Sequence, residues 1–385
     1  MSAPQEGFLL IADITGYTGY LSSSELEHAQ EVLQTLLELL IEHTKPPLVI
    51  SRLAGDAVIS YALSASAVQG QTFIEMLENT YISFRKAIER MVLNNTCQCR
   101  ACANIPALDL KFFSHYGTFA VQRLSTQDEL VGSDVNLIHR LLKNHVTERT
   151  GLKAYTLYTQ SALDRLGIEG IGGSMTSLTE EYEHLGEVRV WVQDMAAVWE
   201  RRRKAVQVTI PPGEVALHGE IEIALPPYRV WDYLVQPEYR KIIFGSDKQN
   251  ILDRRDGRVT EGSIYQCFHG KRVVAQTILE WLPFELMVTE DRLSANATAL
   301  VELRLASDGD GTRLGVNVGT RGASAPARLV MKGMMAAVKK SKRAALAAFK
   351  QRVEREAEAA GEGPGGPVFS TEAVRAAARS GLTEG

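Results

Sequence analysis

The chain opens with an unbroken apolar run over residues 8–12, which is typical of a strand buried on both faces. Apolar residues then recur every three or four positions through residues 24–43 and predict a one-sided helix. The pattern next switches between short apolar runs and longer helical stretches. It predicts strands 48–50 and 57–61 around the turn Ala54-Gly55-Asp56, a helix over 72–93, two strands meeting at Gly117 within 108–122, and a helix over 135–142.

Strict alternation dominates the second half of the chain. Residues 216–224 interleave apolar and mainly charged positions, and Pro226-Pro227 opens a short helix. After Pro326 an apolar stripe predicts one long helix with a basic outer face. The remaining strands are predicted at 263–269, 272–282, 285–291, 298–306 and 312–319; the stripe is Val330, Met334, Val338, Ala345, Phe349 and Val353, and the basic face is Lys339, Lys340, Lys342 and Arg343.

These patterns indicate an α+β protein of two domains. The first domain is predicted over 1–197 and the second over 214–357. A charged stretch followed by Pro and Gly marks 198–213 as a linker, and its arginine run favours a solvated face over a nucleic-acid site. The Gly- and Ala-rich tail, 358–385, is predicted to be disordered.

The amino-acid composition excludes few classes of protein. The apolar fraction of 45% allows ordinary cores, and the net charge of −4 indicates no particular partner. No basic and apolar leader opens the chain, and no apolar run approaches the ~18 residues of a transmembrane helix. We therefore expect a cytoplasmic protein with no transmembrane segment and no nucleic-acid partner.

Two carboxylates stand at the ends of predicted strands. Asp13 ends the first apolar run, just before the turn that contains Gly16, and Asp56 lies at the tip of the predicted hairpin. Acidic oxygens beside turning backbone are suited to Mg²⁺ or Mn²⁺ ions that carry phosphates. The alternative is that Asp13 merely caps a turn.

A polar pair on the later helix suggests a phosphate or ribose contact. Asn136 and Arg140 are four residues apart and share one helix face. An amide and a guanidinium that point the same way suit ribose and phosphate oxygens. The alternative is an ordinary solvated helix face.

Three of the four cysteines are clustered as Cys97-x-Cys99-x-x-Cys102. They could supply three ligands of a structural Zn²⁺ site, remain unliganded thiols, or form a redox switch. A fourth zinc ligand would come from elsewhere, with His115, Cys267 or a second subunit as the alternatives.

Three separated motifs give the first half a specific resemblance. They are Phe8-x4-Asp13-Ile14-x-Gly16-Tyr17-Thr18, Gly55-Asp56-Ala57 and Gly132-x2-Val135-Asn136-x3-Arg140. In this order they resemble the catalytic domain of class III nucleotidyl cyclases, which implies a ferredoxin-like fold and sites shared between two protomers. The resemblance covers about half the chain.

The resemblance implies a role for each matched residue. Two metal ions would be held by Asp13, Asp56 and the Ile14 carbonyl, and the turn Thr15, Gly16, Tyr17 and Thr18 would cradle the β- and γ-phosphates. From the other protomer, Asn136 would orient the ribose and Arg140 would stabilise charge at the α-phosphate. The implied reaction is attack of the ribose 3′-oxygen on the α-phosphorus, with pyrophosphate leaving.

The chain departs from the family pattern at the base and phosphate positions. Arg52 stands where adenylate-selective members have Lys, and Glu129 stands where they have Asp. The charges argue for ATP over GTP and leave a pyrimidine nucleotide open. The phosphate-binding lysine near the domain end is replaced by Glu183-His184-Leu185-Gly186, with Arg189 as a distant substitute.

The element order of the second half resembles the START-like (SRPBCC, polyketide-cyclase-like) helix-grip fold. The resemblance implies an antiparallel sheet and a long helix around an apolar cavity for a hydrophobic small molecule or lipid. Trp231, Phe268, Trp281 and Met334 are predicted to line it, with plain core packing as the alternative.

Taken together, the sequence favours a homodimeric cyclase that acts on a nucleoside triphosphate and that a ligand in the second domain regulates. The alternatives are an inactive homologue that serves as a nucleotide- or lipid-binding sensor, and a lipid-transfer protein whose first half only dimerises.

Overall fold

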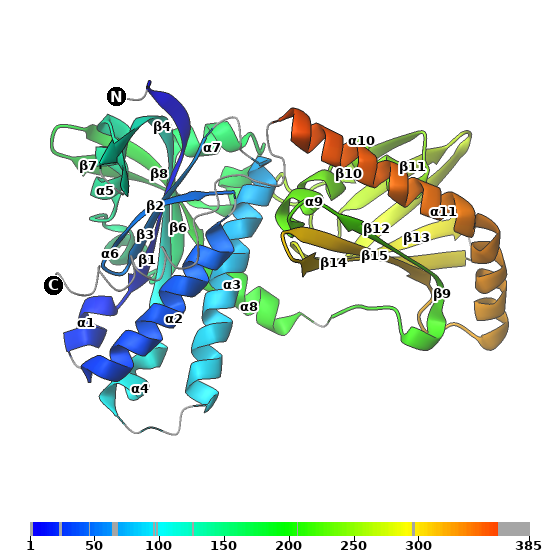
Figure 1. Ribbon diagram of the computed structural model, residues 1–385, viewed down its shortest axis with the longest axis horizontal. Coiled ribbons are helices and arrows are strands. Elements are labelled where there is room, and N and C mark those ends of the chain that lie inside the picture. Colours follow the sequence, from blue (N-terminus) through cyan, green and yellow to red (C-terminus); the bar gives the residue numbers. More distant parts are fainter. Residues whose placement is uncertain are drawn as a thin grey trace. The chain divides into compact units, whose positions relative to one another are not determined.

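The computed structural model describes residues 3–22, 25–45, 47–63, 68–94, 97, 99–124, 127–205, 207–294 and 297–360. It divides into an N-terminal unit that ends at Ala205 and a C-terminal unit that begins at Val206 (Figure 1). Each unit has its own sheet, so the chain is a mixed α+β protein as predicted. Among the helices in these ranges, none combines the length and the apolarity that a membrane crossing requires.

The N-terminal unit is built on a sheet with the strand order β2-β3-β1-β4-β6-β8-β7, and β5 pairs with β4. Helices connect β1 to β2 and β3 to β4, so the first four strands have the βαββαβ connectivity of a ferredoxin-like fold. The strands are β1 (Gln5–Thr15), β2 (Val49–Ala54), β3 (Ala57–Leu63), β4 (Asp109–Leu124), β5 (Gln127–Val131), β6 (Tyr155–Thr159), β7 (Thr176–Tyr182) and β8 (Gly186–Asp194). The α-helices are α1 (Tyr17–Ser22), α2 (Leu26–Thr44), α3 (Gly70–Asn94), α4 (Arg100–Asn104), α5 (Ser133–Leu141), α6 (Val146–Thr150), α7 (Gln160–Leu166) and α8 (Met195–Lys204), and the short 3₁₀ segments are η2 (Ile105–Ala107) and η3 (Ile171–Ser174).

Strand β1 is central, and both of its faces are covered. On one face Phe8 stacks on Phe73 of α3, with ring centroids 4.6 Å apart. On the other face Leu9 and Ile11 join a core with Val135 and Ile138 of α5. Helices α2 and α3 lie side by side in this unit (Figure 1). The apolar run of residues 8–12 is therefore explained by burial on two sides.

The sequence predicted that two strands meet at Gly117. In the structure a single strand, β4, runs through this residue. A Cβ at Gly117 would collide with the carboxylate of Asp134 on α5, so the glycine permits a close approach between the helix and the strand. That carboxylate accepts a hydrogen bond from the Thr118 N–H at 2.6 Å and lies 3.3 Å from Nε2 of His115. These contacts fix the start of α5, the helix that carries Asn136 and Arg140.

The first domain extends past its expected end at residue 197. Helix α8 continues through the arginine run to Lys204, because Val198 and Trp199 pack inward and hold it against the unit. Most of the tail that was expected to be disordered, from residue 361 on, lies outside the described residues.

The C-terminal unit is a seven-stranded antiparallel sheet with the order β10-β11-β12-β13-β14-β15-β9, accompanied by a long C-terminal helix. The element order agrees with the sequence prediction, although α10 and β10 were not predicted. Assignment to the START-like fold stays a prediction, as does regulation by a hydrophobic ligand. The elements are η4 (Pro212–Glu214), β9 (Val215–Ile223), α9 (Pro227–Leu234), α10 (Pro237–Phe244), β10 (Lys248–Asp253), β11 (Ile264–His269), β12 (Arg272–Leu282), β13 (Leu286–Ser294), β14 (Ala297–Asp308), β15 (Gly311–Gly319) and α11 (Ala325–Ala359).

The apolar stripe of α11 is buried only in its second half. Phe349 and Val353 have no exposed surface, whereas Val330 is 62% exposed and Met334 48%. The reason is that the later turns of α11 pack on α10 and β9 and the earlier turns have far less of the sheet beneath them (Figure 1). The predicted basic face is also interrupted, because Nζ of Lys342 turns inward and donates to the Ile243 carbonyl at 3.4 Å.

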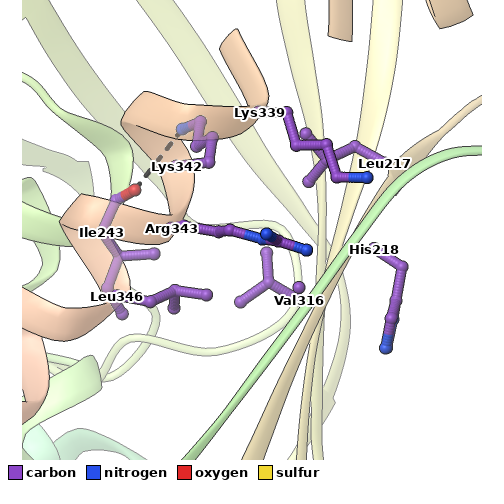
Figure 2. A pocket seen from close by; sticks show the side chains of 9 residues that line it. Leu217, His218, Ile243, Val316, Lys339, Lys342, Arg343 and Leu346 are labelled. Atoms are coloured by element: carbon purple, nitrogen blue, oxygen red, sulfur yellow. Dashed lines mark hydrogen bonds between the residues drawn. The ribbon is translucent and has the colours of Figure 1, made fainter. Parts of the chain in front are cut away.

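A small pocket lies between β9 and α11, and none of the four residues predicted to line an apolar cavity lines it. That pocket has a volume of about 10 Å³, which is room for about one water molecule. Trp231 is fully buried and packs edge-to-face on the partly buried Trp281, with centroids 4.8 Å apart, so Trp231 belongs to the core and Trp281 packs against it. Phe268 and Met334 do not line the pocket either. Its lining is Leu217, His218, Gly219, Ile243, Val316, Lys339, Lys342, Arg343 and Leu346 (Figure 2).

Candidate functional site

A polar pocket of about 280 Å³ lies where β1 ends beside the β2–β3 hairpin. β1 supplies Asp13 and Ile14, the following turn leads into α1, and the hairpin tip supplies Asp56. The two carboxylates, far apart in sequence, therefore share one pocket. The full lining is Asp13, Ile14, Thr15, Gly16, Tyr17, Thr18, Gly19, Asp56 and Lys111.

Strand register brings the two acids together. Asp13 pairs with Ala57 across the β1–β3 ladder, so Asp56 is the next residue toward the hairpin tip. The Ile14 N–H donates to the Asp56 carbonyl at 3.2 Å and closes the junction. Gly16 turns the chain with φ of 89°, a conformation that side chains rarely adopt. The predicted positions of Asp13, Ile14, Asp56 and the turn 15–18 in one site thus agree with the structure.

Burial makes the ionised forms of the two carboxyl groups unfavourable. Burial and, to a smaller extent, the charge of Asp56 raise the pKa of Asp13, the ammonium of Lys111 opposes them, and the resulting pKa is about 6. Burial also raises the pKa of Asp56. Carboxylate and carbonyl oxygens are hard ligands, and a divalent cation would neutralise the charges that burial disfavours. The residues present therefore fit Mg²⁺ or Mn²⁺.

Sequence reasoning missed Lys111 as a member of the site. It pairs with Asp13 across the β1–β4 ladder, and its Nζ lies 5.0 Å from the centre of the Tyr155 ring. Burial lowers its pKa, and the carboxylates of Asp13, Glu148 and Asp109 oppose that shift. Only the pairing of β4 with β1 reveals this cation, because nothing in the local sequence distinguishes it from a surface lysine.

Arg52 and Glu129, the residues expected at the nucleotide base, are brought together but lie outside the pocket lining. Arg52 Nη1 of β2 and Glu129 Oε2 of β5 form an ion pair at 2.9 Å. Both side chains keep part of their surface exposed. Their role in base selection stays a prediction.

Asn136 and Arg140 do not line the pocket of their own unit. Both side chains are exposed on α5, whose apolar face packs into the core through Val135 and Ile138. They share one helix face, as their spacing predicted, and that face is exposed to solvent. Contribution of this face to another protomer's pocket stays a prediction.

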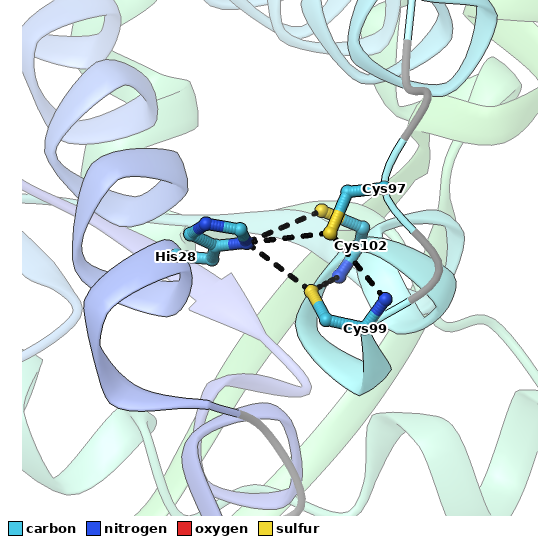
Figure 3. A group of neighbouring side chains, drawn as sticks. All are labelled: His28, Cys97, Cys99 and Cys102. Carbon is cyan, nitrogen blue, oxygen red and sulfur yellow. Dashed lines mark hydrogen bonds between the residues drawn. The ribbon is translucent and has the colours of Figure 1, made fainter.

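His28 of α2 lies beside the three clustered cysteines and is the fourth potential metal ligand of the group (Figure 3). The sequence did not indicate this residue. Two of the expected candidates, His115 and Cys267, do not belong to the cluster. His115 Nδ1 lies 2.9 Å from the Thr159 hydroxyl oxygen inside the core, and Cys267 belongs to the C-terminal unit, where Gln249 donates to its sulfur. Helix α2 lies so far upstream of the cysteines that only the folded chain could identify His28.

The Glu183-His184-Leu185-Gly186 stretch forms the turn between β7 and β8, with His184 at φ of 69°. It does not contribute to the pocket. Arg189 stacks on Trp191, with the guanidinium carbon 4.9 Å from the ring centre. The proposed substitute for the family lysine is therefore engaged elsewhere, and Lys111 is the lysine in the lining.

Replacing Asp13 by Asn is expected to stabilise the metal-free protein at high pH. The pKa of Asp13 rises from 3.8 to about 6 on folding, so protonation favours the folded state. The destabilisation is absent below pH 3.8 and complete above about pH 6. In chelator at pH 8, Asp13→Asn should raise the free energy of unfolding by about 1–3 kcal/mol, measured by urea denaturation.

At pH 4 the same substitution should change the free energy of unfolding little, because Asp13 is then largely protonated in the folded protein. The exposed carboxylate of Asp164 offers a matched control, and Asp164→Asn should have no effect at either pH. Equal effects of Asp13→Asn at the two pH values would show that charge burial is not the cause.

Comparison with known proteins found a matching family model and several similar solved structures. A family model described as "Protein of unknown function (DUF2652)" matches residues 33–150. The solved guanylyl cyclase Cya2 is 14% identical, with a TM-score of 0.37, over 49% of this chain and 92% of its own. The adenylyl cyclase CyaB from P. aeruginosa is 16% identical, with a TM-score of 0.37, over 50% of this chain and 95% of its own.

A relative found by sequence comparison shows the family of this chain. The Mycobacterium tuberculosis protein "Uncharacterized protein Rv2561/Rv2562" is 30% identical over 164 residues, which are 42% of this chain and 72% of the relative. The chain therefore belongs to the same family as this mycobacterial protein.

Proposed function

We propose that the N-terminal unit is a metal-dependent nucleotidyl cyclase that converts a nucleoside triphosphate, with ATP expected, to a 3′,5′-cyclic nucleotide and pyrophosphate. One observation carries the proposal: two carboxylates, a lysine and a glycine turn line the same pocket. The cyclase-like motifs place chemically suitable residues at these positions. A pocket of about 280 Å³ is slightly smaller than common small-molecule sites, which suits a triphosphate whose base and ribose extend beyond it.

Asp13, Asp56 and the Ile14 carbonyl would hold the metal ions. When bound, two Mg²⁺ or Mn²⁺ ions would supply Lewis-acid stabilisation of the phosphates and a lower pKa for the ribose 3′-hydroxyl. The acids contribute by being ionised and fixed before substrate arrives. Their positions depend on the β1–β3 register, which ties Asp13 to the hairpin tip that carries Asp56.

The other residues would act on the nucleotide directly. Backbone N–H groups of Thr15 to Thr18 would donate to the β- and γ-phosphates, and Lys111 would add a positive charge beside them. Asn136 and Arg140 of a second protomer would orient the ribose and stabilise charge on the α-phosphate. This division explains why these exposed residues of α5 lie outside their own pocket.

Base selection would depend on the ion pair of Arg52 and Glu129. Each side chain retains exposed surface, so a base edge could reach both. The guanidinium would donate to a ring nitrogen, and the carboxylate would accept from an exocyclic amine. Adenine offers both groups, which is why ATP is the expected substrate.

Incubation of the full-length protein with Mn²⁺ and each of the four nucleoside triphosphates should yield a cyclic nucleotide and pyrophosphate, with the greatest yield from ATP. Products would be identified by mass spectrometry, and a chelator should stop the reaction. Nucleotide binding by isothermal titration calorimetry without product from any triphosphate would instead favour a binding module.

A further inference from the structure

Four metal-ligating side chains converge outside the nucleotide pocket (Figure 3). His28 projects from α2, and Cys97, Cys99 and Cys102 surround the start of α4. Their ligand atoms all lie within 4.8 Å of one another. Two segments that are distant in sequence thus present one nitrogen and three sulfurs to a common centre.

The distances agree with tetrahedral coordination. With Zn–S near 2.3 Å and Zn–N near 2.0 Å, a tetrahedral site separates nitrogen from sulfur by about 3.6 Å. His28 Nδ1 lies 3.3 Å from Sγ of Cys99, 3.7 Å from Sγ of Cys97 and 3.9 Å from Sγ of Cys102. The three separations bracket the tetrahedral value.

Backbone groups support negative charge on two of the three sulfurs, those of Cys97 and Cys99. The Cys99 N–H donates to Sγ of Cys97 at 3.5 Å, and the Cys102 N–H donates to Sγ of Cys99 at 3.4 Å. Such bonds favour thiolates, which are the form that binds metal. Three thiolates and one imidazole in a tetrahedron are the donor set of structural Zn²⁺, because no position is left for water or substrate.

We propose that His28, Cys97, Cys99 and Cys102 bind one structural Zn²⁺ that fastens α4 to α2. Helix α4 has only five residues and would be marginal without an anchor. A hydrogen bond also joins the residue before α2 to α4: the Glu25 carboxylate accepts from the Ala101 N–H at 3.0 Å. The metal site is independent of the proposed cyclase activity and can be present without it.

The site also supports the wall of the nucleotide pocket. Helix α4 leads directly into η2, and the Ala107 carbonyl lies 3.1 Å from where a Cβ on Gly16 would stand. The segment that Zn²⁺ holds is therefore packed against the glycine turn. Loss of the metal should loosen the turn as well as α4.

Metal analysis of the full-length protein tests the assignment. Mass spectrometric metal analysis should find about one Zn²⁺ per chain. His28→Ala and Cys99→Ser should each reduce bound zinc at least tenfold, whereas the thiol control Cys267→Ser should keep it, because Cys267 lies in the C-terminal unit. Cobalt substitution of the wild-type protein should give the visible absorption of tetrahedral Co²⁺ with thiolate charge transfer.

Reversible removal of zinc from the wild-type protein tests the proposal even if the variants fail to fold. A chelator should lower Tm by about 5–10 °C and speed hydrogen exchange in residues 99–108 and 15–18, and added Zn²⁺ should restore both. Protein that lacks stoichiometric metal and takes up neither Zn²⁺ nor Co²⁺ would overturn the proposal. So would equal loss of zinc in Cys267→Ser and His28→Ala.

Discussion

Cyclic-nucleotide formation is expected to fall on the order of 10³-fold in Asp56→Asn. The substitution keeps the shape of the side chain and removes one of the two charges on which the proposed divalent-cation site depends. A bound metal contributes several kcal/mol of transition-state stabilisation, and each 1.4 kcal/mol corresponds to about a factor of ten. The measurement is kcat with Mn²⁺ and ATP at pH 8, where the Asp13 carboxylate is ionised.

A matched carboxylate separates loss of the metal site from a general effect. Asp164 is exposed on α7 and does not line the pocket, so Asp164→Asn should keep wild-type kcat. Asp56→Asn should also lose Mn²⁺ binding while its Tm remains at least that of the wild type. Activity of Asp56→Asn within tenfold of the wild type would contradict the proposed site.

Mixing two inactive variants is expected to restore activity. Arg140→Ala alone should lower kcat by about 10²–10³-fold, because a group that stabilises transition-state charge is lost. If Arg140 acts on its partner's substrate, a mixed dimer of Arg140→Ala with Asp56→Asn has one intact site. After co-expression in equal amounts, half of the dimers are mixed and each has one of its two sites, so we expect about one quarter of wild-type activity.

The outcome depends on where Arg140 acts. If it served the pocket of its own protomer, both sites of a mixed dimer would be defective and mixing would give only the sum of the two residual activities. Co-expression of Arg140→Ala with Asn136→Ala provides the control, because both changes fall on the same α5 face. Each site of that mixed dimer keeps its acids but lacks one of the two groups that the partner would supply. That pair should not be rescued.

Local pattern was sufficient for the elements that build the pocket. The apolar run before Asp13 predicted a strand covered on both faces. In the structure this strand lies inside the sheet, with α3 on one side and α5 on the other. The Gly55-Asp56 turn between two apolar runs gave the hairpin, which β2 and β3 form. The local pattern predicted burial less reliably where tertiary packing decides which residues are covered. In α11 the apolar stripe is regular, but only its later turns are covered.

The sequence by itself determined four features: the central strand, the acids at its end and at the hairpin tip, the polar pair on α5, and the three clustered thiols. Each is a feature of neighbouring residues and their periodicity. Only the tertiary structure decided that Lys111 joins Asp13 across the β1–β4 ladder and that His28 completes the thiol cluster. It also decided that Trp231 is a core residue against which Trp281 packs. These outcomes depend on strand order, register and helix packing, which bring together residues whose separation along the chain carries no periodic signal.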